Sequence, residues 1–129
     1  MVLEVNGGDN CSWYFKGVGL GKDTQMKVYS PLRKADGLIR ANIWNWAESW
    51  GTPQWWEDGK MICEMTYKEE TDPDYEDLYA TVKNKTTRKY CSPAEDCYMF
   101  SCKPTEGAHS GQVRVTDQFG NTFVQEISW

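Results

Sequence analysis

Apolar and polar residues alternate over short segments through most of the chain. In residues 11–16, for example, Trp13 and Phe15 fall on one face, and residues 25–29 and 111–116 repeat the pattern. A period of two is typical of strands that bury one face, and Asp-Gly pairs and similar turn residues separate the segments. The pattern predicts an all-β fold, a β-sandwich of about eight or nine short antiparallel strands.

Residues 38–46 form the longest predicted strand, and its two faces differ. One face carries Ile39, Ala41 and Ile43. The opposite face carries one leucine, two polar residues and two tryptophans, namely Leu38, Arg40, Asn42, Trp44 and Trp46. Only one face of a strand in a two-sheet sandwich meets the common core. The tryptophan face must therefore be covered by another element or stay partly exposed.

Tryptophan is concentrated in residues 41–60, which hold five of the chain's seven tryptophans, at positions 44, 46, 50, 55 and 56. The indole ring buries a large area but its N–H needs a partner, so such clusters sit where a core meets a wet rim or another surface. Both interpretations stay open: core packing for a small β domain, or a platform for a ligand or partner. The candidate contact residues are Trp44, Trp46, Trp50, Asn42 and Asn45.

One segment predicts a short helix, near residues 72–82. Asp72 or the threonine before it can cap the N-terminus, Pro73 suits the first helical position, and acidic residues follow in the first turn. The run of acidic residues here also raises the alternative of a calcium site. An EF-hand loop would need a glycine in place of Asp77 and a carboxylate in place of Lys83. We therefore interpret the acids as complementing the helix dipole.

Length and charge limit the function classes. With 129 residues the chain is most simply one domain, residues 1–129. Its 14 basic and 19 acidic residues give a net charge of −5, and no lysine or arginine stripe appears. Because phosphate contacts need clustered cations, we expect no nucleic-acid partner. No apolar run approaches the roughly 20 residues of a membrane helix, so no membrane span is predicted.

The five cysteines, at positions 11, 63, 91, 97 and 102, do not follow the spacing of zinc sites. The chain's one histidine, His109, lies in a predicted loop, and the sequence predicts no metal site. In an oxidising compartment, Cys91 and Cys97 are the closest pair for a disulfide because they flank a short turn. The other cysteines are predicted to be buried free thiols.

The glycine-rich residues 17–21 are a candidate phosphate-binding loop. A P-loop ends in Gly-Lys followed by serine or threonine, whereas Asp23 follows Lys22 here. Strand-like residues come next, although a phosphate loop opens a helix. We therefore predict a simple turn.

Several separate motifs carry a family resemblance, and in chain order they are residues 25–31, 41–46, 56–60, 64–66, 72–73 and 115–120. They resemble the C-terminal domain that follows the catalytic domain in secreted bacterial calcineurin-like metallophosphoesterases. The chain departs from that family's pattern at Cys97 and Tyr98, where a histidine is expected, and at Gln118, where a basic residue is commoner. The resemblance covers nearly the whole chain.

The resemblance implies an accessory β-sandwich domain excised from a larger chain, with the catalytic domain of the same parent as its partner. It also implies a periplasmic or extracellular bacterial location, and two divalent metal ions in the parent's catalytic domain. A two-metal centre needs several histidines and bridging carboxylates, whereas this chain has only His109. We therefore predict no catalytic residue and no cofactor in this chain.

Two functions remain open. In the first, the chain is a non-catalytic domain that packs Trp44, Trp46 and Trp50 against the catalytic domain. In the second, it is a carbohydrate-binding module whose tryptophans stack on the rings of a glycan, with Asn42, Asn45 and Gln54 beside them. The resemblance favours the first function, because nothing in it implies sugar specificity.

Overall fold

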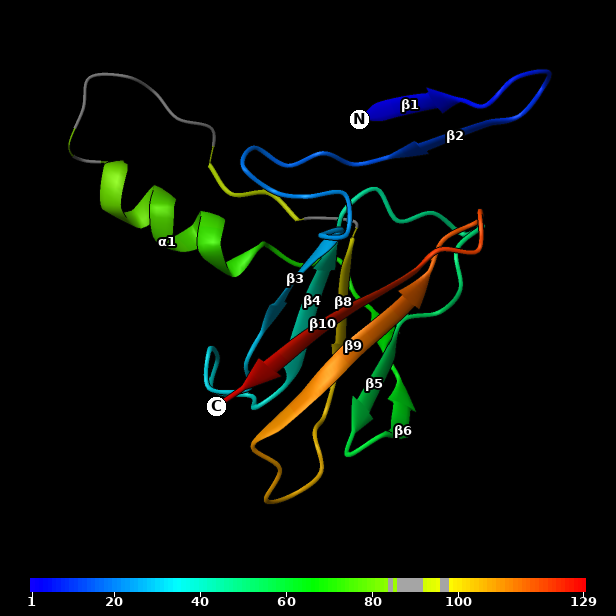
Figure 1. The fold of residues 1–129 in the computed structure, drawn as a ribbon. Helices are drawn as coiled ribbons and strands as arrows, with labels where there is room; N and C mark the ends of the chain where they lie inside the picture. The colour runs from blue at the N-terminus through cyan, green and yellow to red at the C-terminus, as the bar shows by residue number, and fades with distance from the viewer. Residues whose placement is uncertain (84, 86–91, 96–97) are drawn as a thin grey trace.

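The computed structural model describes residues 1–83, 85, 92–95 and 98–129, and these contain ten strands and one helix (Figure 1). In chain order the strands are β1 (Val2–Val5), β2 (Cys11–Tyr14), β3 (Met26–Tyr29), β4 (Ile39–Ile43), β5 (Gln54–Glu57), β6 (Lys60–Glu64), β7 (Thr66–Tyr67), β8 (Met99–Cys102), β9 (Ser110–Thr116) and β10 (Thr122–Ser128). The helix α1 (Pro73–Val82) lies between β7 and β8 in the sequence. No helix within these residues is long and apolar enough to cross a membrane.

The strands form two four-stranded sheets and one small hairpin. The first sheet, in the order β3-β4-β8-β7, is called the β4 sheet below, and the second, in the order β10-β9-β5-β6, is called the β9 sheet. All the pairings are antiparallel. The hairpin of β1 and β2 lies at the upper end of the molecule in Figure 1. Residues of both larger sheets meet in one core, which confirms the predicted all-β sandwich.

The core is built from residues that alternate along each strand. From β4 come Ile39, Ala41 and Ile43, which are fully buried as the sequence pattern predicted. Apolar side chains of β5, β9 and β10 face them from the β9 sheet. The core cluster consists of Met26, Ile39, Ala41, Ile43, Trp55, Met65, Phe100, Cys102, Val113, Val115 and Phe123. Burial of these side chains supplies the main stabilisation of the fold.

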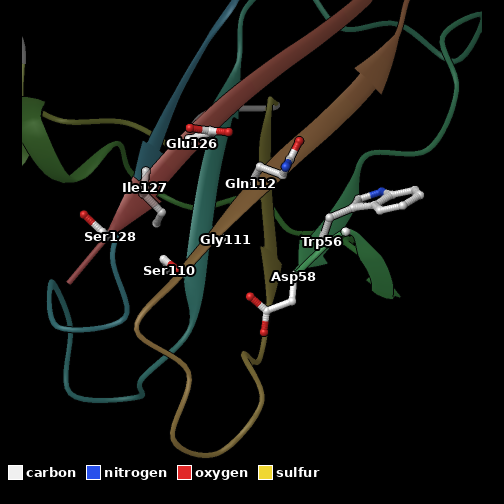
Figure 2. A pocket seen from close by; sticks show the side chains of 9 residues that line it. Trp56, Asp58, Ser110, Gly111, Gln112, Glu126, Ile127 and Ser128 are labelled. Carbon is white, nitrogen blue, oxygen red and sulfur yellow. The ribbon is translucent and has the colours of Figure 1, made fainter.

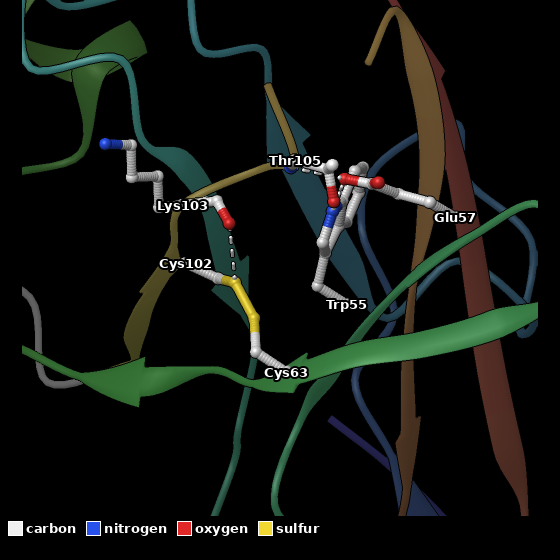
Figure 3. Close-up of a disulfide and its surroundings, with 6 residues drawn as sticks. All are labelled: Trp55, Glu57, Cys63, Cys102, Lys103 and Thr105. Atoms are coloured by element: carbon white, nitrogen blue, oxygen red, sulfur yellow. Dashed lines mark hydrogen bonds between the residues drawn. A yellow bond between two sulfur atoms is a disulfide. The ribbon is translucent and has the colours of Figure 1, made fainter. Parts of the chain in front are cut away.

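Trp55 is the largest fully buried side chain, and the β9 sheet holds it closely. Its Nε1 donates to Glu57 Oε1 at 2.7 Å, and Thr105 N donates to the same oxygen at 2.9 Å (Figure 3). Burial acts to raise the pKa of Glu57, but these hydrogen bonds outweigh it and the pKa is lowered. The indole lies directly over Gly111, where a Cβ would also come 2.6 Å from the carbonyl oxygen of Trp56. Only glycine therefore fits at this position of β9.

A disulfide joins Cys63 of β6 to Cys102 of β8 and so links the two sheets (Figure 3). The prediction that these two cysteines are free is wrong, because spacing along the sequence does not show that β6 and β8 meet in space. Cys11 is free, but it is exposed and not buried as predicted. The predicted pair Cys91 and Cys97 lies outside the described residues.

The strand predicted over residues 38–46 is shorter than expected, because β4 ends at Ile43. A turn follows, in which Asn45 has a φ of 62°, the left-handed region that asparagine tolerates better than most residues. The turn redirects the chain, so Trp44 and Trp46 do not continue the outer face of β4. The prediction of a tryptophan face on this strand is therefore wrong.

The N-terminus of α1 is fastened to the outer face of the β4 sheet, and the helix confirms its prediction from the sequence. Asp72 caps the helix, since its carboxylate accepts from Asp74 N at 2.9 Å and Tyr75 N at 3.2 Å. The same carboxylate accepts from Tyr29 Oη at 2.9 Å and from Asn42 Nδ2 at 2.8 Å. We call Tyr29, Asn42 and Asp72 the Asp72 network.

Ion pairs extend this connection between sheet and helix. Arg40 is buried on the same face, where its Nε donates to Glu70 at 2.8 Å and its guanidinium pairs with Asp36. The hydrogen bond from Arg40 lowers the pKa of Asp36 to about 2. Burial acts to raise the pKa of Asp72, but the hydrogen bonds of its network and of α1 outweigh it and the pKa is lowered. The polar residues of this outer face therefore hold the helix.

Candidate functional site

One end of the sandwich gathers aromatic side chains from several separate segments. The β1–β2 hairpin meets the β9–β10 turn there, where Trp13 and Phe119 pack edge to face with ring centroids 4.8 Å apart. The β4–β5 connection reaches the end of β9 just before this turn, since Gly51 N donates to Thr116 O at 2.8 Å. We call this region the aromatic end, and its residues are Trp13, Phe15, Trp44, Trp46, Trp50, Tyr67, Tyr98 and Phe119.

Trp46 forms the wall of an open apolar hollow at the aromatic end. Its ring packs edge to face on Phe100 of the core, with centroids 5.0 Å apart, and stacks on Tyr67 at 6.4 Å with an interplanar angle of 25°. The hollow measures about 480 Å³ and is lined by Trp46, Ala47, Glu48, Tyr67 and Tyr98. Its lining is mainly aromatic, so it suits an apolar side chain of a partner.

The other two candidate tryptophans lie at the same end but face different neighbours. Trp44 packs against Phe15 with centroids 5.4 Å apart, and Trp50 packs against Phe123 of the core at 6.1 Å. Both are half-buried. The structure therefore brings the three predicted tryptophans to one end, yet it does not align their rings into a single stacking platform. That arrangement favours a packing surface over a sugar-stacking site at these residues.

The two candidate asparagines are separated by the end of β4. Asn45 is half-buried in the turn of the aromatic end, beside Trp44 and Trp46. Asn42 is 5 % exposed and donates to Asp72 at 2.8 Å on the outer face of the β4 sheet. Asn42 therefore does not join the candidate site, because its side chain is used to hold α1.

Large exposed apolar side chains also gather at the aromatic end. On β1, Leu3 is 61 % and Val5 69 % exposed, while Tyr67 is 44 % and Phe119 36 % exposed. In the hairpin, Leu3 pairs with Trp13 of β2, which is the residue that contacts Phe119. An exposed group of apolar residues beside polar loops is typical of a protein interaction site.

Sequence reasoning missed several residues of this end, notably Trp13, Tyr67, Tyr98 and Phe119. Their signal in the sequence is an aromatic residue at the end of a predicted strand or in a turn. Such a residue can also be part of the core, so the signal becomes useful only once Trp13 is known to contact Phe119 and Tyr67 to contact Trp46. The tertiary arrangement supplied that information.

The structure describes most of the residues that the sequence suggested for metal binding and phosphate binding. Among the residues that the structure describes, no three histidine, cysteine, aspartate or glutamate side chains lie close enough to hold a metal ion. His109 is exposed in the connection before β9. The glycine-rich residues 17–21 form a turn closed by a hydrogen bond from Leu20 N to Gly17 O at 3.2 Å, as predicted.

The structure defines a small disulfide-linked β-sandwich with an apolar aromatic end. The model of one protein family, described as the C terminal of calcineurin-like phosphoesterase, matches residues 1–123. The chain therefore belongs to this family, as its motifs predicted. No curated protein and no solved structure matches the chain.

Proposed function

We propose that this domain is a non-catalytic accessory domain that packs its aromatic end against the catalytic domain of a calcineurin-like phosphoesterase. The single observation that carries the proposal is the half-open aromatic hollow at Trp46 together with the exposed apolar residues around it. In isolation these side chains expose apolar area to water, and docking would remove it.

The position of the domain in its family supports this end as the contact surface. In the proposal the catalytic domain precedes this domain in the parent chain, as the family description suggests, and would be joined to it through β1. The β1–β2 hairpin belongs to the aromatic end (Figure 1). A tether at this end keeps the catalytic domain close to the aromatic residues and raises its effective concentration there.

In this proposal the reaction takes place outside the domain. A calcineurin-like centre would hold two divalent metal ions through several histidines and bridging carboxylates. The chain offers His109 alone and, in the part described, no cluster of metal ligands. The proposal assigns the metal ions and the catalytic residues to the preceding catalytic domain, whose cleft this domain would support or shield.

The disulfide supports a periplasmic or extracellular location for the domain. Disulfides persist in oxidising compartments and are rare in the cytosol of most cells. The bond between Cys63 and Cys102 closes the sandwich across its core, where its reduction would weaken the fold. Mass spectrometry of the alkylated protein, isolated from its native host without reductant, tests the proposal, because a reduced pair would contradict it.

A calorimetric titration of the 129-residue chain with the separately expressed catalytic domain tests docking. We expect heat of binding that Trp46→Ala weakens by roughly tenfold or more, because the ring forms the wall of the hollow. Trp56→Ala is the matched control, since Trp56 lies on the outer face of the β9 sheet and should bind like the wild type. No heat of binding, or an equal loss in both variants, would contradict the proposal. Circular dichroism before titration checks that each variant is folded.

A further inference from the structure

The outer face of the β9 sheet carries an ordered group of polar side chains around Trp56. The register of β5, β9 and β10 sets two neighbouring rows across this face. One row consists of Gln54, Arg114 and Val124, and the next consists of Trp56, Gln112 and Glu126. A row of aligned side chains on three strands presents a fixed pattern of donors and acceptors to solvent.

Trp56 is fixed in place by its neighbours on this face. Its Nε1 donates to Gln54 Oε1 at 3.0 Å, and the Arg114 guanidinium lies over the indole, 4.1 Å from the ring centroid. Arg114 Nε in turn donates to Gln112 Oε1 at 2.9 Å. These contacts hold the ring in one orientation while it stays only half-buried. A preorganised aromatic side chain loses little conformational entropy when a ligand binds.

Two open hollows lie beside Trp56, and this residue is part of the lining of both. The first, shown in Figure 2, measures about 360 Å³, and its polar residues are Asp58, Ser110, Gln112, Glu126 and Ser128. The second measures about 330 Å³, and its polar residues are Thr52, Gln54, Glu64, Arg114, Thr116 and Thr122. Each volume is at the lower end of the range of roughly 300–1,000 Å³ that is typical of small-ligand sites.

The lining of the two hollows selects one ligand chemistry. It contains one cation, Arg114, against three carboxylates, those of Asp58, Glu64 and Glu126, so it repels phosphates and other anions. Hydroxyl, amide and carboxylate groups make up most of the rest, so an apolar ligand would leave buried polar groups without partners. Within the described residues, neither the amide nitrogen of Gln112 nor the carboxylate of Glu126 has a hydrogen-bond partner, and both are available to a ligand.

An uncharged ligand with many hydroxyl groups and an apolar C–H face fits this surface. Its hydroxyls can donate to carboxylates and accept from amide N–H groups, as the polar residues here require. Its C–H face can pack against the face of the Trp56 indole opposite the Arg114 guanidinium. We propose that the outer face of the β9 sheet binds a neutral oligosaccharide that crosses Trp56 and occupies both hollows. This site borders the aromatic end at Thr116 and Thr122 but uses a different tryptophan.

Affinity electrophoresis of the 129-residue chain tests the proposal. The native gels contain one of three neutral polysaccharides, soluble starch, hydroxyethyl cellulose or galactomannan, and a fourth gel contains anionic polygalacturonate. We expect slower migration in at least one neutral gel and none in polygalacturonate. Trp56→Ala should weaken that retention by roughly tenfold, because the sugar loses its stacking partner. Trp46→Ala is the matched control and should migrate like the wild type.

Exposed Glu126 provides a second variant that does not disturb the core. Glu126→Ala should also weaken retention by several fold while the protein melts at the wild-type temperature. Unchanged migration in all three neutral gels, retention only in polygalacturonate, or retention that survives both Trp56→Ala and Glu126→Ala would each overturn the proposal. Because docking to the catalytic domain is read by calorimetry with Trp46→Ala, the two proposals can fail independently.

Discussion

The two outer faces of the sandwich carry similar polar residues and use them in opposite ways. On the β4 sheet, Arg40 and Asn42 are buried and bonded to acidic residues at the start of α1. On the β9 sheet, Trp56, Gln112 and Glu126 border open hollows in contact with solvent. A polar or aromatic side chain on a strand therefore indicates a binding face only when no other element of the chain covers that face.

The largest loss of stability is expected when the disulfide that joins the two sheets is removed. The disulfide spans 39 residues, and the loop-closure estimate for such a span gives about 4 kcal/mol of stability. The double variant Cys63→Ala, Cys102→Ala should lower the free energy of unfolding by about that amount in urea titrations. Wild-type protein in reductant should show the same loss. Equal stability with and without reductant would show that the link contributes nothing.

The second test contrasts the two faces directly. Asp72→Ala removes the helix cap and leaves Tyr29 and Asn42 without their shared acceptor, so we expect a loss of about 3 kcal/mol. Glu126→Ala on the other face is the matched control and should change stability by less than about 0.5 kcal/mol. Urea titration of both variants gives the two values. Similar losses would mean that the two faces do not differ as the structure indicates.

A third test asks how closely the inner side of the β9 sheet is packed. Gly111→Ala would push a Cβ into the buried Trp55 ring, so we expect a loss of about 2 kcal/mol or more. Gly51→Ala is the matched control, because a Cβ there would lie 3.6 Å from Thr116 O, an ordinary contact. It should be nearly neutral in thermal unfolding. A stable Gly111→Ala variant would show that the Trp55 ring can move.

The smallest expected effect is on the free energy of unfolding at acidic pH. The folded-state pKa values of Asp72 and Asp36 are lowered, that of Asp36 to about 2, so both carboxylates favour the folded state above their unfolded pKa of about 3.9. This stability is lost as the pH falls from about 4 towards 2. Asp72→Asn keeps a capping residue but cannot titrate. Its free energy of unfolding should fall less steeply with acid than that of the wild type, and parallel curves would contradict the assignment.

Most of the architecture could be predicted from the sequence, because burial of one strand face leaves a clear period. The alternation of Ile39, Ala41 and Ile43 placed β4 in the core, and the cap at Asp72 placed the helix. The end of β4 could not be predicted, since it depends on one left-handed residue, Asn45. The disulfide was missed because its cysteines come from strands in different sheets.

The candidate site was only partly predictable for a related reason. Trp44, Trp46 and Trp50 stood out by composition, and the structure places all three at one end. Whether a tryptophan is core or surface depends on contacts between distant segments, such as that of Trp13 with Phe119. The burial of Asn42 likewise depends on Asp72, which lies on another element. No local pattern carries that information.

The Asp72 network also constrains how relatives of this chain can diverge. One carboxylate serves Tyr29, Asn42 and the start of α1 at once, so the cost of changing any member depends on whether the others are present. Substitutions at Tyr29 and Asn42 should therefore accumulate together, in lineages where Asp72 has already been replaced. Aligned sequences of the family should show correlated exchange at these three positions, whereas Glu126 should vary independently of them.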